Sequence, residues 1–274
     1  MTLTRAQAKV LLEEHGLRPK RKLGQNFVVD ANTVRRIVRL AEVRPGDKVL
    51  EIGAGLGSLT DSLVEAGAEV VALEIDPELV DILSSRPELS GVEVVHGDAL
   101  EVDFDDLAPA QGSAWSVVAN LPYNVATPVT LRVLERATQI TRLTVMVQLE
   151  VAERLAAGPD HAAYGAASVR VAYHAHAKIV GKIPPTVFLP QPSVDSALVS
   201  IVRRDAPPFD DSEATEGETF AIVRQAFSQR RKMLRRSLAG VVAPEAFERA
   251  GVSPMARPEE LAVSDFGRLA HEAR

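Results

Sequence analysis

Short apolar segments alternate with segments of helical periodicity through residues 48–148, and this alternation limits the possible folds more than any other feature of the sequence. A helix that connects two strands carries the chain back over the sheet, so the strands that it joins run parallel. The sequence therefore predicts an α/β fold with a mostly parallel sheet flanked by helices. The expected strands are residues 48–52, 69–74, 92–95, 115–119 and 143–148, with helices beginning at Ser58, Pro77 and Thr127.

Further elements are expected on both sides of this region. Residues 4–15 have a helical pattern, and Asp30 is a suitable N-cap for a helix that continues to about residue 42. Near the end of the region, residues 174–180 and 197–202 have the character of strands and bracket a proline-rich loop. No internal repeat is visible in the chain.

An acidic segment, residues 205–218, follows the predicted strands. It is poor in large apolar residues, which is typical of a linker, and only short helical patterns follow it. We therefore predict two domains. Residues 1–207 would form the α/β domain with a basic N-terminal segment, and residues 208–274 a small all-α domain.

The composition excludes several kinds of site. The 274 residues include no cysteine, so the chain has neither a disulfide framework nor a thiolate zinc site. His174 and His176 have no carboxylate cluster near them in sequence, which favours a surface or strand role over metal binding. No apolar run is long enough to span a bilayer, and the first residues do not resemble a signal peptide. We expect a monomeric cytoplasmic protein with neither a metal nor a membrane partner.

Charge is distributed unevenly along the chain. The net charge of −6 would by itself argue against a polyanionic partner. However, residues 1–40 have nine Lys and Arg residues against three acidic residues, a net charge of +6. Residues 220–236 have six Lys and Arg residues and no acidic residue, which also gives +6. The remainder of the chain therefore carries −18. Because salt limits each field to about a Debye length of 8 Å, these two basic segments can attract phosphates locally.

A glycine-rich turn, Gly53-Ala-Gly-Leu-Gly57, follows the first predicted strand and opens a helix. Glycines at such a position allow a tight turn and a close approach of the backbone to a ligand. A dinucleotide-binding turn would have its third glycine one residue later, where this chain has Ser58. The observed spacing, preceded by Glu51, is typical of methyltransferases that use S-adenosylmethionine (SAM).

Carboxylates follow the next two predicted strands. Glu74 ends the second strand and could accept hydrogen bonds from both hydroxyls of a ribose, while Asp98 follows the third and could accept from an adenine amino group. Simpler roles are also open, because Glu74 could cap the next helix together with Asp76, and Asp98 could cap a turn. Their common position at the carboxyl edge of the sheet favours cofactor binding.

The segment Asn120-Leu-Pro-Tyr123 follows the fourth predicted strand. The side-chain oxygen of Asn120 and the backbone carbonyl of Leu121 can accept the two hydrogens of an exocyclic amine, and Pro122 restricts the backbone that carries this carbonyl. Tyr123 offers a flat face to an extruded base. Two acceptors that draw the hydrogens toward tetrahedral geometry make the nitrogen lone pair available, so the segment can prepare a planar nitrogen for methylation. The alternative is a strand end with a turn.

Five sequence blocks together resemble the bacterial KsgA-type dimethyltransferases of small-subunit ribosomal RNA, which have a Rossmann-like, SAM-dependent methyltransferase fold. The blocks occur in the family's order, and the combination is highly specific. The resemblance implies transfer of four methyl groups, two to the N6 amino group of each of two adjacent adenosines near the 3′ end of the 16S RNA, within an immature 30S subunit. The blocks are residues 24–27, 51–60, 120–127, 188–196 and 226–232.

The resemblance also implies roles for individual residues. Asn26 and Val28 would close over the methionine end of the cofactor, with Gly53 beneath it. Phe188 would offer a second aromatic face to the target adenine, with core packing as the alternative. Arg236 departs from the family's pattern, which commonly has Asn at this position. The family's detailed contacts of the C-terminal helix are therefore not carried over to this chain. The implied cofactor residues are Asn26, Val28, Gly53, Gly55, Glu74, Ile75, Asp98, Ala99 and Asn120, and the implied catalytic residues are Asn120, Leu121, Pro122 and Tyr123.

The second basic segment is a candidate RNA-binding surface of the C-terminal domain. A continuous helix through it would place Arg231 and Arg235 on one face, with Lys232 beside them, and would turn Met233 and Leu234 toward the body of the domain. The hypothesis is that the three basic residues bind RNA phosphates. The alternative is an ordinary solvated helix face.

Other functions share parts of this pattern. Related enzymes that methylate large-subunit RNA usually have Ile where this chain has Leu121. A non-catalytic assembly or transcription factor could keep the fold and the RNA surface, but the complete cofactor edge argues against it. Enzymes that methylate DNA adenine or protein glutamine use a similar Asn-x-Pro-Tyr segment, whereas the basic residues 229–232 favour RNA.

Overall fold

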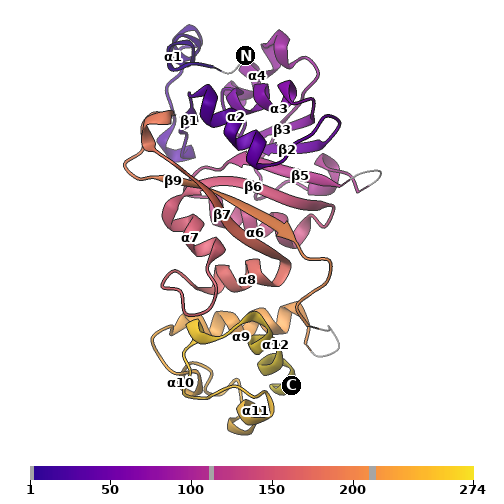
Figure 1. Cartoon of the computed structure of the whole chain (residues 1–274), viewed down its shortest axis with the longest axis vertical. Helices are drawn as coiled ribbons and strands as arrows, with labels where there is room; N and C mark the ends of the chain where they lie inside the picture. The colour runs from indigo at the N-terminus through magenta and orange to yellow at the C-terminus, as the bar shows by residue number, and fades with distance from the viewer. Residues whose placement is uncertain (1–2, 111–113, 210–213) are drawn as a thin grey trace. The chain divides into compact units, whose positions relative to one another are not determined.

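A seven-stranded sheet dominates the N-terminal part of the protein (Figure 1). The computed structural model describes residues 3–110, 114–209 and 214–274. Neighbouring strands pair in parallel from one edge through β6, and β9 is antiparallel to β6. These pairings confirm the predicted mostly parallel α/β sheet. In spatial order the strands are β4 (Glu93–His96), β3 (Glu69–Glu74), β2 (Lys48–Ile52), β5 (Trp115–Asn120), β6 (Ile140–Gln148), β9 (Ser196–Arg203) and β7 (Ala175–Ile183).

The order of the strands reverses beside β2. The chain proceeds outward from β2 through β3 to β4, then returns to place β5 on the other side of β2. At such a reversal the connections after the two central strands leave in opposite directions, and a crevice opens at their carboxyl ends. The glycine-rich turn follows β2, and the Asn120 segment follows β5, so the topology brings both predicted motifs to this crevice.

Helices pack on the sheet because its strands alternate buried side chains between two faces. Figure 1 shows α2 and α3 on one face of the sheet and α6 on the other. Val49, Val70, Val118 and Met146 point toward α2 and α3 and form one apolar cluster with them. The helices that follow or precede strands of this part are α2 (Ala31–Leu40), α3 (Ser58–Glu65), α4 (Pro77–Ser85), η2 (Pro87–Leu89), α5 (Phe104–Leu107), α6 (Ala126–Arg136) and α7 (Leu149–Ala156).

A separate two-stranded pairing holds the N-terminal segment near the sheet. Strand β1 (Phe27–Val28) runs antiparallel to β8 (Phe188–Leu189), with Val28 opposite Phe188. This pairing joins segments that are far apart in sequence. The short elements around it are α1 (Arg5–Glu14), η1 (Arg21–Leu23) and η3 (Pro185–Val187).

The C-terminal unit has a helical core of its own. The chain divides into Met1–Ala152 with Lys178–Arg203, and Glu153–Ala177 with Arg204–Arg274. In the second unit, Tyr164 and Tyr173 pack in one apolar cluster with Phe220, Phe247 and Phe266. Its helices are α8 (Ala166–His174), α9 (Glu216–Ser228), α10 (Leu234–Ser237), α11 (Pro244–Arg249), η4 (Pro258–Glu260) and α12 (Val263–Glu272).

The division corrects the predicted domains in two respects. Residues 153–177 were expected in the α/β domain, but the structure places them with the C-terminal helices because their apolar side chains pack there. The end of the predicted linker is helical, since Thr215 caps α9 and accepts a hydrogen bond from the backbone N–H of Glu218. Residues 210–213 of that linker lie outside the described residues. Across the described ranges, no helix is both long enough and apolar enough to cross a membrane.

Candidate active site at the carboxyl edge of the sheet

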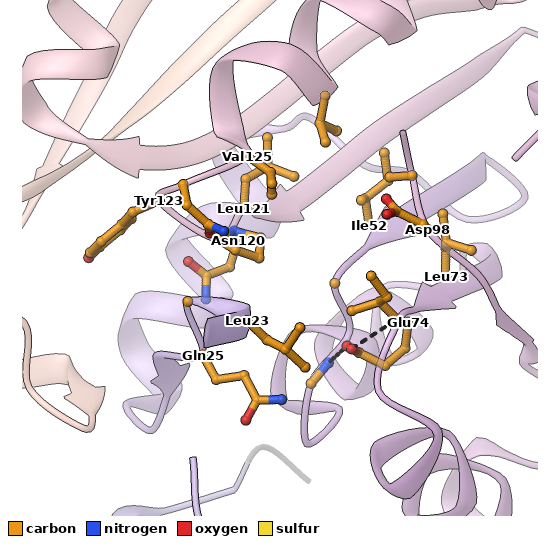
Figure 2. A pocket seen from close by; sticks show the side chains of 18 of the residues that line it. Leu23, Gln25, Ile52, Leu73, Glu74, Asp98, Asn120, Leu121, Tyr123 and Val125 are labelled. Carbon is orange, nitrogen blue, oxygen red and sulfur yellow. Dashed lines mark hydrogen bonds between the residues drawn. The ribbon is translucent and has the colours of Figure 1, made fainter. Parts of the chain in front are cut away.

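A cavity of ≈ 280 Å³ lies at the carboxyl ends of β2, β3 and β5 (Figure 2). Apolar side chains, among them Leu23, Ile52 and Leu73, form part of its wall, and a few polar groups reach it. This combination is typical of a small-molecule site. The cavity gathers nearly all the residues that the sequence had assigned to the cofactor and the target: Asn26, Gly53, Gly55, Glu74, Ile75, Asp98, Ala99, Asn120, Leu121, Pro122 and Tyr123.

The glycine-rich turn needs its glycines for both conformation and space. Gly53 and Gly55 have φ angles of 77° and 60°, in the left-handed region that side chains disfavour. A Cβ atom on Gly55 would also lie 3.0 Å from Cδ1 of Phe27. The turn therefore brings bare backbone to the edge of the cavity, as a bound ligand would require.

Glu74 organises this turn. One oxygen of its buried carboxylate, Oε2, accepts a hydrogen bond from the backbone N–H of Gly55 (2.8 Å), and Oε1 accepts from Ile75 (2.9 Å) and Asp76 (3.0 Å). Burial raises the pKa of Glu74, while these three N–H groups act in the opposite direction. The alternative that Glu74 and Asp76 together cap the next helix is partly correct, because Asp76 is the N-cap of α4. Two carboxylate oxygens offer about four acceptor positions, so Glu74 keeps one for a ligand.

Asp98 combines the two roles that the sequence left open. Its Oδ1 atom accepts a hydrogen bond from the backbone N–H of Leu100 (2.8 Å), as in a capped turn. Its Oδ2 atom has no partner among the described residues, and the side chain lies at the cavity (Figure 2). Asp98 can therefore accept a hydrogen bond from a ligand without breaking its turn.

Asn120 is held in a defined orientation at the end of β5. Its side-chain amide nitrogen, Nδ2, donates a hydrogen bond to the backbone carbonyl of Asn26 (2.9 Å). The amide oxygen, which can only accept, is thereby left for another group. The next peptide is also anchored, because the N–H of Leu121 donates to the carbonyl of Met146 (3.1 Å). The two predicted acceptors thus lie on a fixed strand end.

Tyr123 is anchored at the tip of its ring. Its hydroxyl lies 2.9 Å from the hydroxyl of Ser196, at the start of β9, and the residue is only partly buried. Burial raises the pKa of the phenol, and the contact with Ser196 opposes this change. The ring therefore lines the cavity in a restrained position, and the sequence did not identify Ser196 as the group that restrains it.

Two predicted residues do not line this cavity. Phe188 is 0% exposed and packs in the core with Val34 and Ile37. Its ring has no open face, so the core-packing alternative is correct. The cause is the pairing of β8 with β1, which turns the ring inward. Val28 is also buried, and it borders a smaller void beside Gly53 instead of the main cavity.

The N-terminal segment covers part of the cavity, which sequence reasoning had not foreseen beyond Asn26. Lys20 donates a hydrogen bond to Asp76 (2.8 Å) and forms a second ion pair with Glu78, while Gln25 donates to Asp76 (2.7 Å). The hydrogen bonds to Asp76 and then Glu78 raise the pKa of Lys20. This cation of the first basic segment is thus bound within the protein. In the sequence, this contact was indicated only by the acidic residues Asp76 and Glu78 at the start of α4.

The C-terminal basic segment is exposed, but it is not a continuous helix. Helix α9 ends at Ser228, and α10 begins only at Leu234, so the predicted helical winding through the segment is wrong. Leu234 is buried, as expected, and its side chain belongs to the core of the second unit. Three cations protrude from the turn and the short helix, and none has a side-chain partner within the described part of the chain: Arg231, Lys232 and Arg235.

The cavity and its polar groups fit SAM. The glycine turn presents backbone, Glu74 keeps an acceptor position for a ribose hydroxyl, and Asp98 has an oxygen without a partner that can accept from an adenine amino group. A Rossmann-like sheet with this site defines the class of SAM-dependent methyltransferases.

Comparisons with known proteins identify the family within this class. The model of the ribosomal RNA adenine dimethylase family matches residues 16–274, and the chain belongs to this family. It is 49% identical to a ribosomal RNA small subunit methyltransferase A of Kineococcus radiotolerans, over 98% of this chain and 90% of that protein. It is 48% identical to the protein of the same name from Streptomyces coelicolor, over 97% of this chain and 94% of that protein.

Two solved structures share the fold over most of the chain. The 23S rRNA methyltransferase ErmE has a TM-score of 0.69 and 26% identity, covering 90% of this chain and 98% of that one. A dimethyladenosine transferase from Plasmodium falciparum has a TM-score of 0.73 and 23% identity, covering 88% and 94%. The similarity to the Plasmodium falciparum structure shows a common fold and nothing more.

Proposed function

We propose that this protein transfers methyl groups from SAM to the N6 amino groups of two adjacent adenosines near the 3′ end of 16S RNA, two to each, within an immature 30S subunit. Membership of the adenine dimethylase family supports the reaction, and the names of the relatives support the small-subunit substrate. The observation that carries the proposal is the orientation of Asn120, whose amide nitrogen is bound to Asn26 and whose oxygen is left to accept from an amine.

The target adenine would be held by the strand end after β5. The side-chain oxygen of Asn120 and the backbone carbonyl of Leu121 accept the two amine hydrogens, which favours a tetrahedral nitrogen with an available lone pair. Pro122 restricts the backbone of this carbonyl, and the anchored ring of Tyr123 supports the base. Most of the catalysis is then positioning. A methylated cationic amine loses its proton readily, so the mechanism needs no metal.

Bound SAM supplies the methyl group on a positively charged sulfur, and the chain provides its binding groups. We assign Glu74 to the ribose hydroxyls, Asp98 to the adenine amino group, and Asn26 with the turn at Gly53 and Gly55 to the methionine end. Ile75 and Ala99 add apolar wall beside the carboxylates. In the C-terminal unit, Arg231, Lys232 and Arg235 are proposed to bind RNA phosphates. We infer a monomer that acts in the cytoplasm, where small subunits are assembled.

The test is methylation of purified 30S subunits that lack these modifications, with isotopically labelled SAM and mapping of the modified nucleotides. We expect label on two adjacent adenosines near the 3′ end, approaching four methyl groups per subunit. Subunits that already carry the modification are the control and should take up no label. Label confined to large-subunit RNA would contradict the proposal.

Methylation of large-subunit RNA is the second candidate, because the structure of ErmE covers most of the chain. The identities favour the small subunit, since the small-subunit relatives are 48–49% identical and the large-subunit enzyme is 26% identical. Leu121 between Asn120 and Pro122 agrees with this choice.

Replacing Glu74 with Ala should weaken SAM binding by about 1.5–3 kcal/mol, or roughly 10- to 160-fold, because a charged acceptor for the ribose is lost. Calorimetric titration with SAM measures this effect. Glu69→Ala removes an exposed carboxylate at the opposite end of the same strand and should leave the affinity unchanged. Equal affinities of the Glu74 variant and the wild type would remove Glu74 from the cofactor site.

A further inference from the structure

Glu51 is a buried carboxyl group that the mechanism above does not use. It lies near the end of β2, two residues before the glycine turn, and its side chain is only 1% exposed. Its Oε2 atom has no hydrogen-bond partner among the described residues. Buried polar atoms are nearly always partnered, so an unpartnered carboxylate oxygen indicates a missing ligand, water or proton.

A small void beside this carboxyl group shares part of its wall with the active site. The void has a volume of ≈ 30 Å³ and is lined by Glu51, Ser58, Gly53, Gly55 and Asn120, of which the last three also line the main cavity. The hydroxyl of Ser58 likewise has no partner in the part of the chain that is described. Two unpartnered polar groups therefore face a space at the back of the proposed cofactor loop.

The charged groups packed around Glu51 do not include a free cation. Burial raises the pKa of Glu51 to about 8; contact with Thr60 opposes the shift, and the negative charges of Glu74 and Asp61 add to it. Asp61, one of these neighbouring carboxylates, is already paired, because the guanidinium of Arg86 donates two hydrogen bonds to it (2.8 and 2.9 Å). Burial therefore favours the protonated, neutral form of Glu51 in the free protein.

We propose that Glu51 is the counter-charge for the cationic sulfonium group of the cofactor, and that binding of SAM releases the Glu51 proton to solvent. This inference rests on the proposed function, because it requires SAM in the main cavity. The positive charge of the sulfonium group would lie on the other side of the glycine turn from Glu51. Because an opposite charge nearby stabilises a carboxylate, the ionised form of Glu51 then becomes favourable. The product, S-adenosylhomocysteine, has one positive charge fewer in the same site, so Glu51 takes up a proton after the transfer. Glu51 would thus favour binding of the methyl donor over the product.

Calorimetry measures the released proton directly. SAM is titrated into the wild-type protein at pH 7 in two buffers of different ionisation enthalpy, and the difference in heat gives the number of protons released. We expect most of one proton per SAM and clearly less for S-adenosylhomocysteine. Glu51→Gln should release none, while Glu69→Gln, which changes an exposed carboxylate of the same sheet, should behave as the wild type.

The affinity for SAM should depend on pH with a defined sign. Below the pKa of Glu51, about 8, binding must displace a proton. The Kd of the wild type should therefore fall by up to tenfold for each unit of increase in pH and level off above that pKa. The Kd of Glu51→Gln should lack this dependence. SAM binding without proton release, or equal proton release with SAM and S-adenosylhomocysteine, would overturn the proposed role of Glu51. Either result would leave the proposed function intact. Absence of SAM binding to the wild type would instead contradict the proposed function.

Discussion

Replacing Asn120 with Ala is expected to reduce methyl transfer by roughly 10²-fold or more, because one oriented acceptor for the target amine is lost in the transition state. In the wild type, the bond from Nδ2 of Asn120 to the carbonyl of Asn26 directs the amide oxygen away from that carbonyl. The measurement is single-turnover transfer from labelled SAM to unmodified 30S subunits. Binding of the subunit should be nearly intact, because base contacts contribute less to affinity than phosphate contacts.

Two further variants make this result specific. Asn32→Ala removes an exposed amide from α2, outside the cavity, and should transfer methyl groups at the wild-type rate. Asn120→Asp retains an acceptor but loses the donor to Asn26, so it tests the orientation of the group. A turnover of Asn120→Ala within a factor of a few of the wild type would show that the two-acceptor mechanism is wrong.

The second large effect is expected on RNA binding. Replacing Arg231, Lys232 and Arg235 together with Ala should weaken binding of the 30S subunit by roughly 10²- to 10³-fold near 0.1 M salt, if each cation contacts one phosphate. The slope of log affinity against log salt should become less steep by roughly 0.7 to 0.9 for each lost contact. Filter-binding titrations over a range of salt concentrations measure both quantities.

SAM affinity should not change in this triple variant, because the cavity lies in the first unit and the three cations lie in the second. A charge-matched control replaces Arg44, Arg136 and Lys178, which are exposed in the first unit and lie outside both basic segments, with Ala. If both triple variants weaken binding equally, the effect is one of net charge. An unaltered salt slope would identify Arg231, Lys232 and Arg235 as ordinary solvated surface.

Much of the cofactor side of the site could be predicted because its signals are local. The residues after β2, β3 and β5 come directly after buried strands, and the carboxyl ends of parallel strands meet at one edge. Knowing that these strands are parallel was therefore enough to bring Gly53, Glu74 and Asn120 to the same cavity. The same reasoning could not identify Ser196, whose contact with Tyr123 depends on a strand from a distant part of the chain.

Other features that the sequence did not reveal depend on contacts between segments far apart in the chain. Phe188 was expected to face a base, yet pairing of β8 with β1 buries it. The ion pairs of Lys20 with Asp76 and Glu78 were likewise not visible in the sequence. In each case, the partner is more than 50 residues away in the chain. Local periodicity and composition contain no information on such a pairing.

By itself, the sequence determined the α/β fold, the glycine turn and the order of polar groups along the sheet edge, because strand alternation and turn chemistry act over a few residues. Only the tertiary structure decided that residues 153–177 join the C-terminal unit, that a turn at residues 229–233 interrupts the basic segment, and that Asn120 is oriented by Asn26. It also decided that the oxygen of Glu51 lies buried without a partner beside the cofactor loop. These features depend on which distant surfaces pack together, and burial then sets the hydrogen-bond partners and the pKa of each group.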